Sequence, residues 1–303
     1  MTRVAAIDCG TNSIRLLIAD IDNGNFREVS RTMEIVRLGQ GVDKTKSFHP
    51  DAIERTLAAV QLFGAEISKR GATKIRFCAT SATRDATNRD LFIDGVESIL
   101  GIKPEVIPGE EEAALSFIGA TKELAFSDGP FLVVDIGGGS TEFVYGTEKV
   151  EFAKSVNIGC VRMSERHFTS APPTPGSIVE AISDIDEAIA VAAKAVPITK
   201  DMTLIAVAGT ATTVAAAALD LDNYDRYAIH LSRISAEKTF AVAKRFQGME
   251  RGEIENLGYM HSGRVDVIAA GSLVLSRIML ATGAKEFVAS ESDILDGMAW
   301  SIS

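Results

Sequence analysis

Cysteine is scarce in this sequence, and its few copies are not paired. Cys9, Cys78 and Cys160 are an odd number, lie far apart and show no Cys-x-x-Cys spacing. A disulfide framework or a zinc site needs an even number or a close spacing, so we expect neither. The four histidines are also scattered, without the spacing of a metal-binding pair, and we expect structural or surface roles for them. Unpaired cysteines fit a reducing, cytoplasmic location.

Long apolar runs and an excess of basic residues are missing too. No run reaches the ~20 apolar residues that span a bilayer, and the chain starts on a strand pattern instead of a signal peptide. The formal net charge is −10 and the pI is about 5.0. We therefore expect neither a membrane nor a nucleic-acid polymer as partner, because both favour basic surfaces. One local basic cleft for a polyanionic ligand is still compatible with this balance.

The chain is long enough for two domains. It has 303 residues, 46% of them hydrophobic, which suggests about two domains of roughly 150 residues with buried cores. The turn-rich stretch Ser127–Pro130 is the predicted boundary, so we expect domains at residues 1–126 and 127–303. The main predicted helices cover residues 50–69, 88–100 with Asn88 as its cap, 110–124, 177–196, 235–246, 263–282 and a last one from 293. The main predicted strands cover residues 4–7, 14–21, 26–38, 74–79, 104–107, 203–207 and 286–290.

The most informative stretch is residues 132–142. A valine-rich apolar run ends at Asp135 and is followed by Gly137–Gly139, two hydroxyl residues and Glu142. The run predicts a buried strand, and the glycines let the backbone turn with its N–H groups exposed to an anion. Because an aspartate repels a bare phosphate, the stretch predicts a divalent cation that binds both negative groups. The alternative is a glycine hairpin without a ligand, which is disfavoured because glycines weaken a strand connection that needs no close backbone approach.

A shorter copy of this pattern opens the chain. Asp8–Ser13 repeats the Asp-x-Gly-x-x-Ser spacing, again with an apolar strand on each side. P-loops and dinucleotide-binding loops lead into a helix instead, so neither of those motifs applies. The repeat predicts two related α/β domains. Four hydroxyl groups of the two loops could donate hydrogen bonds to phosphate, those of Thr11, Ser13, Ser140 and Thr141.

Three further stretches follow predicted strands or begin predicted helices. Gly209 and Thr210 open a helix, where N–H groups favour anions, although an ordinary threonine cap is equally compatible. Arg84 follows a strand end and could bind phosphate through two hydrogen bonds, or it could be a surface charge. Glu110–Glu112 could interact with a helix dipole or include a base that activates water. The residues alone leave these alternatives open.

Eight motifs, in order along nearly the whole chain, resemble those of the exopolyphosphatase/guanosine pentaphosphate phosphatase (Ppx/GppA) family. They are Asp8-x-Gly10-Thr11-Asn12-Ser13-x-Arg15-Leu16, Ala79-Thr80-Ser81-Ala82-x-Arg84-x-Ala86, Ile107-x-Gly109-x-Glu111-Glu112-Ala113, Asp135-Ile136-Gly137-Gly138-Gly139-Ser140-Thr141-Glu142, Gly159-Cys160-Val161, Gly209-Thr210, Arg264-Val265-Asp266-x-Ile268-x-Ala270-Gly271 and Ser292-Asp293-x-x-x-Gly297. The family belongs to the actin-like ATPase superfamily. The resemblance therefore implies an α/β fold with two ribonuclease-H-like domains around a central cleft.

The resemblance also implies hydrolysis of a terminal phosphoanhydride bond with Mg²⁺ or another divalent cation. Glu112 matches the second glutamate of the family's Gly-x-Glu-Glu-Ala motif, the base that activates the attacking water, and Glu111 matches the first glutamate and is the second catalytic residue that the resemblance implies. Asp135 would hold the metal together with Glu142 or Asp8. The residues implied in phosphate binding are Thr11, Asn12, Ser13, Arg15, Arg84, Gly137, Gly138, Gly139, Ser140, Gly209 and Thr210. These roles suit phosphoryl transfer, which requires positioning and charge neutralisation more than a covalent nucleophile.

The expected activity is that of an exopolyphosphatase that releases orthophosphate from inorganic polyphosphate, with a homodimer as a candidate assembly. A guanosine pentaphosphate (pppGpp) 5′-phosphohydrolase is the nearest alternative, and a kinase of the same superfamily is a third. An actin-like binding or assembly module without turnover is the non-enzymatic alternative.

The chain departs from the family in two places. Ala113–Leu115 stand where many members carry an arginine, and the helical C-terminal region of longer members is missing. We therefore expect the short, two-domain form, without a long basic polymer channel in one subunit.

Overall fold

The computed structural model describes residues 2–22, 24–198 and 201–303, and it divides into two compact α/β units. The first unit comprises Met1–Leu115 and Ile294–Ser303, and the second comprises Ser116–Asp293. The division falls inside helix α5 (Gly109–Thr121), earlier than the boundary predicted after residue 126, because Leu115 belongs to the core of the first unit. The end of the chain returns to the first unit because helix α13 (Ile294–Ser301) packs on its strands β1 and β2.

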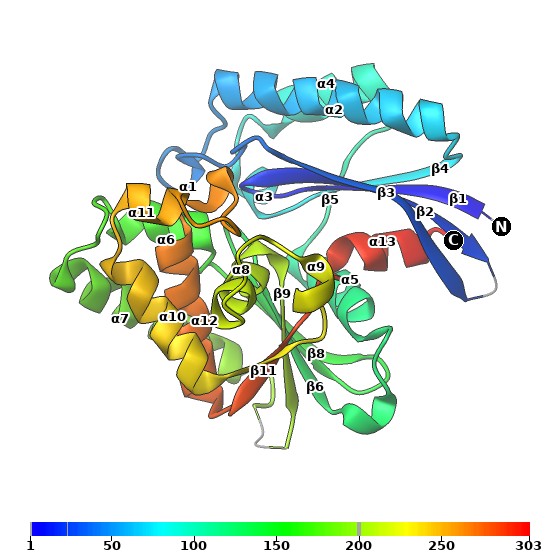
Figure 1. Ribbon diagram of the computed structural model, residues 1–303. Helices are drawn as coiled ribbons and strands as arrows, with labels where there is room; N and C mark the ends of the chain where they lie inside the picture. The colour runs from blue at the N-terminus through cyan, green and yellow to red at the C-terminus, as the bar shows by residue number, and fades with distance from the viewer. Residues whose placement is uncertain (1, 23, 199–200) are drawn as a thin grey trace. The chain divides into compact units, whose positions relative to one another are not determined.

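The first unit is a five-stranded mixed sheet with helices on both faces. Its strands are β1 (Thr2–Cys9), β2 (Ser13–Asp22), β3 (Asn25–Ile35), β4 (Lys74–Ala79) and β5 (Glu105–Val106), in the order β3-β2-β1-β4-β5. Alternate residues of a strand face opposite sides. Ile7 and Cys9 therefore pack toward α2 (Pro50–Arg70) and α4 (Arg89–Leu100), whereas Ala6 packs toward α13. Figure 1 shows α2 and α4 on one side of this sheet and α13 on the other.

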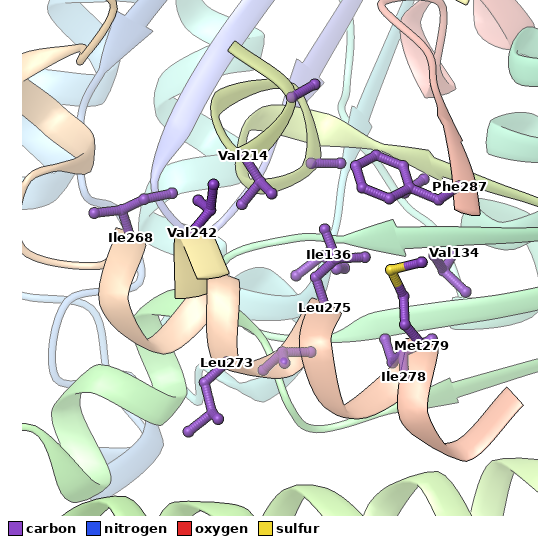
Figure 2. Packing of buried hydrophobic residues seen from close by; sticks show 14 of the residues in the cluster. Val134, Ile136, Val214, Val242, Ile268, Leu273, Leu275, Ile278, Met279 and Phe287 are labelled. Atoms are coloured by element: carbon purple, nitrogen blue, oxygen red, sulfur yellow. The ribbon is translucent and has the colours of Figure 1, made fainter. Parts of the chain in front are cut away.

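The second unit is a six-stranded mixed sheet. Its strands are β6 (Phe131–Ile136), β7 (Thr141–Gly146), β8 (Val150–Val156), β9 (Thr203–Val207), β10 (Arg233–Ser235) and β11 (Glu286–Ala289), in the order β10-β11-β9-β6-β7-β8. Four helices cover one face, α7 (Pro175–Ala193), α8 (Ala208–Ala218), α10 (Ala236–Gly248) and α12 (Ile268–Thr282). Figure 2 shows this core, in which Val134 and Ile136 of β6 lie near Leu275 and Met279 of α12.

The remaining elements are short. They are α1 (Val42–Thr45), α3 (Ser81–Asp85), α6 (Cys160–His167), α9 (Arg226–Ile229), α11 (Arg251–Glu255) and the 3₁₀ turns η1 (Phe126–Asp128) and η2 (Ser262–Arg264). Most of them were not predicted, because a helix of one turn has no periodicity to detect. No helix among residues 2–22, 24–198 and 201–303 combines the length and the apolar character that crossing a bilayer requires.

Two of the local predictions are wrong in detail. Asn88 precedes α4, but its side chain makes no capping bond and instead bonds both backbone groups of Phe48, at 2.8 and 3.0 Å. The helix predicted over 263–282 is interrupted, because η2 comes first and α12 starts only at Ile268. In both cases a contact distant in the sequence, or a local turn, overrides a pattern that is only a weak guide.

The predicted repeat is present in the structure. Asp8 pairs with Arg15 in the β1–β2 register, and Asp135 pairs with Glu142 in the β6–β7 register. Both hairpins are closed by the same bond, from the first glycine N–H to the serine carbonyl, at 2.9 Å for Gly10 and 3.1 Å for Gly137. The sheet orders correspond as well, β3-β2-β1-β4-β5 with β8-β7-β6-β9-β11. The predicted fold class, α/β with two related sheets, is confirmed; the cleft between the domains stays a prediction.

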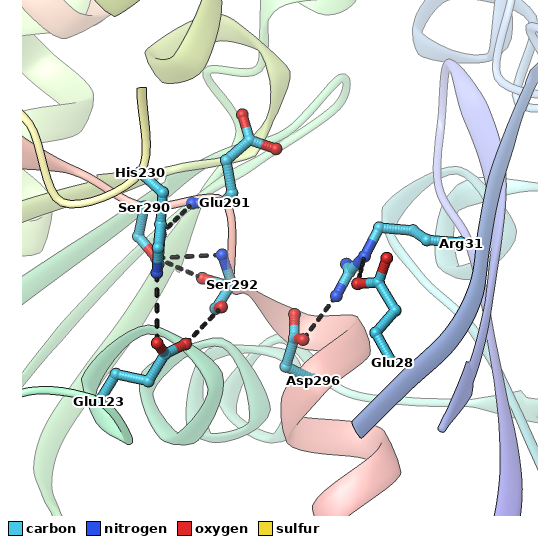
Figure 3. A network of polar contacts seen from close by, with 8 residues as sticks. All are labelled: Glu28, Arg31, Glu123, His230, Ser290, Glu291, Ser292 and Asp296. Carbon is cyan, nitrogen blue, oxygen red and sulfur yellow. Dashed lines mark hydrogen bonds and ion pairs between the residues drawn. The ribbon is translucent and has the colours of Figure 1, made fainter. Parts of the chain in front are cut away.

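Polar contacts fix the segments around α13 in each unit (Figure 3). In the first unit, Arg31 of β3 donates to Asp296 of α13 at 2.6 Å and to Glu28 at 2.9 Å. In the second unit, Ser292 Oγ donates to Glu123 Oε1 at 3.1 Å, and His230 lies 3.5 Å from the same carboxylate.

Two helical glycines lie directly against the backbone of another segment. In the first unit, a Cβ atom on Gly297 would collide with the carbonyl group of Leu115. In the second unit, a Cβ atom on Gly119 would collide with the carbonyl group of Asp293. A backbone carbonyl cannot rotate away as a side chain can, so both positions require glycine.

We predict that Gly297→Ala lowers the free energy of unfolding by about 1–3 kcal/mol, the usual cost of overpacking. Gly252→Ala is the matched control, because Gly252 lies in helix α11 with open space around it. The control should leave stability unchanged or raise it by about 0.5–1 kcal/mol, since alanine favours a helix over glycine. Urea unfolding of both variants checks this, and equal effects would show that the close approach at Gly297 is not constraining.

Candidate active site

In the first unit, Arg84 and Glu112 form a buried ion pair. Arg84 Nη1 donates to Glu112 Oε2 at 2.7 Å and to the carbonyl oxygen of Ile107 at 3.0 Å. Glu112 lies in the first turn of α5 and is 8% exposed. Among the described residues, none accepts a hydrogen bond from Arg84 Nε or Nη2. The pair therefore fixes the carboxylate and leaves donors of the guanidinium for a phosphate.

The surroundings of Glu112 shift its acidity. Burial raises the pKa of the Glu112 carboxyl above its ordinary value near 4.5, and the charge and hydrogen bond of Arg84 oppose that rise. The charge of Asp8 raises this pKa as well, whereas a hydrogen bond with Thr80 lowers it. Arg84 therefore favours the ionised form of a carboxyl whose pKa is raised, and these are properties of a general base.

The carbonyl groups of the first hairpin loop accept hydrogen bonds from the segment that follows β3. The N–H groups of Val36 and Arg37 donate to the Asn12 carbonyl at 3.1 and 2.8 Å, and Gly39 N–H donates to the Thr11 carbonyl at 2.8 Å. Because C=O and N–H of a trans peptide point in opposite directions, the next N–H groups face away from this segment. The Thr11 hydroxyl is buried and has no hydrogen-bond partner among the described residues, which suits a ligand contact.

Asp8 and Arg15 are cross-strand neighbours at the base of this hairpin. Arg15 Nη2 and Nε donate to Asp8 Oδ2 at 2.7 and 3.1 Å. The charge of Asp8 is therefore largely balanced within the hairpin itself. Since Asp8 also affects the pKa of Glu112, the structure brings together four predicted site residues in the first unit: Asp8, Arg15, Arg84 and Glu112.

Glu111 faces in another direction from Glu112. Its carboxylate accepts a hydrogen bond from Arg76 Nη2 at 2.5 Å, and its side chain is 41% exposed. Arg76 also donates to Glu105 at 2.9 Å and to Ser301 Oγ at 2.8 Å, so it joins α5 to β5 and α13. Glu111 thus anchors the start of α5, and its predicted part in catalysis stays a prediction.

In the second unit, the loop Gly137–Gly139 is held from behind in the same way, by the start of α6. Cys160 N–H donates to the Gly137 carbonyl at 2.9 Å, and Val161 N–H donates to the Gly138 carbonyl at 2.9 Å. A Cβ atom on Gly159 would collide with the Gly138 carbonyl, so this position requires glycine. As in the first hairpin, the N–H groups of the loop face away from the segment that holds it.

Two carboxylates lie side by side at the base of the second hairpin. Asp135 of β6 and Glu142 of β7 are direct cross-strand neighbours on one face of the sheet, and both are buried. Ser116 Oγ donates to Asp135 Oδ2 at 2.5 Å, and Ser155 Oγ donates to Glu142 Oε1 at 2.7 Å. The first hairpin has Arg15 at the position of Glu142. The second hairpin therefore places two acids together, and like charges this close repel each other.

This acid pair fits the oxygen ligands that Mg²⁺ prefers. Mg²⁺ is usually bound by one or two carboxylates together with waters and substrate phosphates, so Asp135 and Glu142 suffice as protein ligands. In the part of the chain that the structure describes, no cluster of three or more His, Cys, Asp or Glu side chains is arranged to hold a metal. Asp8, the third predicted ligand, is already paired with Arg15.

Gly209 and Thr210 lie in the first turn of α8, beneath the guanidinium of Arg264. A Cβ atom on Gly209 would lie 2.6 Å from Arg264 Cζ, and Arg264 Nη1 donates to Thr213 Oγ1 at 3.0 Å. The cap residue of α8 is Val207, which makes no side-chain capping bond, so the alternative of an ordinary threonine cap is wrong. The predicted phosphate contacts of Gly209 and Thr210 stay predictions.

No chemical role is assigned to the thiols of the cysteines or to the imidazole rings of the histidines. All three cysteines are buried free thiols, and burial raises the pKa of Cys78 to about 12. The histidines have structural partners, as predicted. His49 and His261 accept backbone hydrogen bonds at helix starts, and His167 lies 3.0 Å from Asp184.

Several residues around the sites carry no recognisable sequence signal. Arg76, Ser116, Ser155 and Arg162 are common residue types whose contacts are made across the fold. The one available signal concerns Ser116, which follows Glu112 by four residues on α5, the spacing of a shared helix face. Arg264 and Gly159 are members of the family motifs, but no role follows from the motifs alone.

We predict that Arg84→Met raises the pKa of the Glu112 carboxyl further, because the cation that opposes burial is removed. The folded protein should then take up the proton of Glu112 at a higher pH than the wild type. An NMR titration of the carboxyl carbon, assigned by its loss in Glu112→Gln, measures both values. Arg70→Met is the control, because Arg70 is exposed and bonds Glu66. An unchanged or lower pKa in Arg84→Met would contradict the pairing.

The chain was compared with protein families and with solved structures. The model of the Ppx/GppA phosphatase family matches residues 17–302. Exopolyphosphatase 2 of Mycobacterium tuberculosis is 44% identical over 316 aligned positions, covering 100% of this chain and 99% of that protein. A guanosine-5′-triphosphate,3′-diphosphate pyrophosphatase of Photobacterium profundum is 35% identical over 186 positions, 61% of this chain and 37% of that protein.

A crystal structure of an exopolyphosphatase-like protein has a TM-score of 0.96 and 45% sequence identity to this chain, covering 99% of this chain and 97% of that one. The similarity to exopolyphosphatase 2 and to the exopolyphosphatase-like protein covers nearly the whole chain, and the family model covers the second hairpin. The chain belongs to the Ppx/GppA phosphatase family.

Proposed function

We propose that this protein is an exopolyphosphatase that hydrolyses the terminal phosphoanhydride bond of inorganic polyphosphate and releases orthophosphate. The observation that carries the proposal is the buried pair of Arg84 and Glu112, 2.7 Å apart, because it holds a carboxylate base in one orientation. The similarity to exopolyphosphatase 2 extends over the whole chain and supports polyphosphate as the substrate.

In this proposal Glu112 takes a proton from the attacking water. Arg84 keeps Glu112 ionised, and its remaining donors bind a phosphate oxygen. In the first unit, the N–H groups of the hairpin loop and the Thr11 hydroxyl are further donors to phosphate oxygens. In the second unit, the N–H groups of the glycine loop have the same proposed role. No covalent nucleophile is needed, because positioning and charge neutralisation account for most of phosphoryl-transfer catalysis.

Asp135 and Glu142 are the proposed ligands of Mg²⁺, and Asp8 is the further predicted one. The adjacent buried carboxylates of the second hairpin support this assignment, because a cation would relieve their repulsion. When bound, the ion would neutralise negative charge on the phosphate oxygens.

The second candidate substrate is pppGpp. It is favoured by the similarity to a guanosine-5′-triphosphate,3′-diphosphate pyrophosphatase, which covers 61% of this chain. Phosphate release from short polyphosphate, long polyphosphate and pppGpp, measured on one purified sample, decides between the two. Turnover of polyphosphate should be the faster; release from pppGpp alone would replace the proposal. Nucleotide exchange between ADP and ATP would instead indicate a kinase, and binding without any release would indicate an actin-like binding module.

We also propose a cytoplasmic location for the protein. The three free thiols support it, because a reducing compartment keeps cysteines in the thiol form. A homodimer stays a prediction that size-exclusion chromatography with light scattering can check.

We predict that Glu112→Gln retains the fold and polyphosphate binding but lowers kcat by roughly 10²–10⁴, the usual effect of losing a general base. Glutamine has the size of glutamate but cannot take the proton. Glu111→Gln is the matched comparison, because the Glu111 carboxylate bonds Arg76 instead. Its effect should be much smaller. Phosphate release at the wild-type rate from Glu112→Gln would rule out the assigned base.

We predict that EDTA abolishes phosphate release and that added Mg²⁺ restores it. Glu142→Gln should raise the Mg²⁺ concentration needed for half-maximal activity, because one of the two proposed carboxylate ligands is removed. The corresponding change in the first hairpin, Arg15→Gln, removes no proposed ligand. Measuring the Mg²⁺ dependence of both variants tests the assignment, and full activity in EDTA would overturn it.

A further inference from the structure

Arg162 is a buried cation whose side chain reaches the backbone of the glycine loop in the second unit. It is 5% exposed, and its Nε donates to the carbonyl oxygen of Gly139 at 2.6 Å. The backbone N–H of the same residue donates to the Gly138 carbonyl at 3.1 Å. A short hydrogen bond from a charged donor in a buried place is among the stronger ones in proteins. The proposed mechanism assigns this arginine no role.

These contacts complete a series of three loop carbonyls that all point toward α6. Cys160 N–H binds the Gly137 carbonyl, Val161 and Arg162 N–H bind the Gly138 carbonyl, and the Arg162 side chain binds the Gly139 carbonyl. The Gly139 carbonyl also accepts from the Gly159 N–H, but only at 3.3 Å. The guanidinium is therefore the main donor that orients the last of the three peptides.

The orientation of each carbonyl decides where the next N–H group points. In a planar trans peptide the C=O of one residue and the N–H of the next point in opposite directions. Binding the carbonyls of Gly137, Gly138 and Gly139 from the α6 side therefore directs the N–H groups of Gly138, Gly139 and Ser140 to the other side. Three successive N–H groups that converge in this way form an anion site.

In the first hairpin, backbone N–H groups of the segment after β3 hold the loop. They donate to the carbonyls of Thr11 and Asn12. Val42 follows Gly39 by three residues, as Arg162 follows Gly159, and it is apolar. The second loop, with a glycine at each of three positions, has more freedom to lose, because glycine restricts the backbone least. The arginine supplies the restraint that the glycines lack.

We propose that Arg162 is a positioning residue, which binds the Gly139 carbonyl so that the N–H groups of the glycine loop stay directed at a phosphate of the substrate. The proposal rests on the proposed function for the identity of the substrate. The buried positive charge of Arg162 also favours phosphate binding, because it stabilises an anion bound on the other side of the loop.

The test compares two arginines on the same helix. Arg162→Met removes the donor to the loop, whereas Arg166→Met, one turn later, removes a donor to Asp184 at 3.0 Å. Tripolyphosphate binding is measured by calorimetry with each change placed in the inactive Glu112→Gln background, and KM and kcat for polyphosphate are measured in the active background. The melting temperature of each variant is recorded as well.

Arg162→Met should weaken tripolyphosphate binding at least about tenfold, because a charge-assisted hydrogen bond is lost. KM should rise with it, and Arg166→Met should leave both values within about twofold of the wild type. A fall in melting temperature with unchanged binding and KM would show that Arg162 is merely structural and would overturn the proposal.

A second substitution keeps the test decisive if Arg162→Met does not fold. Arg162→Lys retains the charge but replaces a planar donor by a point charge on a flexible chain. It should bind tripolyphosphate more weakly than the wild type, and wild-type affinity and KM in this folded variant would refute the role. The two proposals can fail separately. If the wild type releases no phosphate from polyphosphate but Arg162→Met still loses tripolyphosphate binding, the positioning role of Arg162 is supported and the exopolyphosphatase assignment is refuted.

Discussion

The planarity of the peptide bond is the constraint on which both loops depend. Each hairpin loop binds its carbonyl groups to the segment after the third strand of its sheet, Val36–Gly39 in the first unit and Gly159–Arg162 in the second. Because each peptide is planar and trans, the N–H groups that follow these carbonyls point away from that segment. The glycines Gly39 and Gly159 allow this close approach, because a Cβ atom at either place would collide with the loop. The proposed anion site thus depends on hydrogen bonds made by the carbonyl groups on the opposite side of the loop.

Charge burial is the second principle of the site. Glu112 is costly to ionise where it lies, and Arg84 offsets that cost with one direct bond. Burial alone raises the pKa of a glutamate, and a neighbouring cation lowers it. Both effects act on the pKa of the Glu112 carboxyl. Glu111 shows the contrast, because this neighbouring residue on the same helix is only partly buried and its carboxylate binds Arg76.

Much of this architecture follows from local patterns, and the remainder depends on contacts between distant residues. The strand over Lys74–Ala79 and the repeat of Asp8 in Asp135 were predictable because strand periodicity and glycine spacing are local. The return of α13 to the first sheet was not, because it depends on the packing of a distant segment. The candidate base was reachable only through the family motif, and its ion pair with Arg84 joins residues on α3 and α5. No local pattern encodes such a pair.

The two hairpins differ at one position, and this difference has a consequence for a duplicated protein. Opposite Asp8 stands Arg15, and opposite Asp135 stands Glu142. The first hairpin therefore pairs its aspartate with a cation, whereas the second places its aspartate beside another acid. A single exchanged residue thus gives two hairpins of the same backbone design opposite preferences for the charge of a nearby ion.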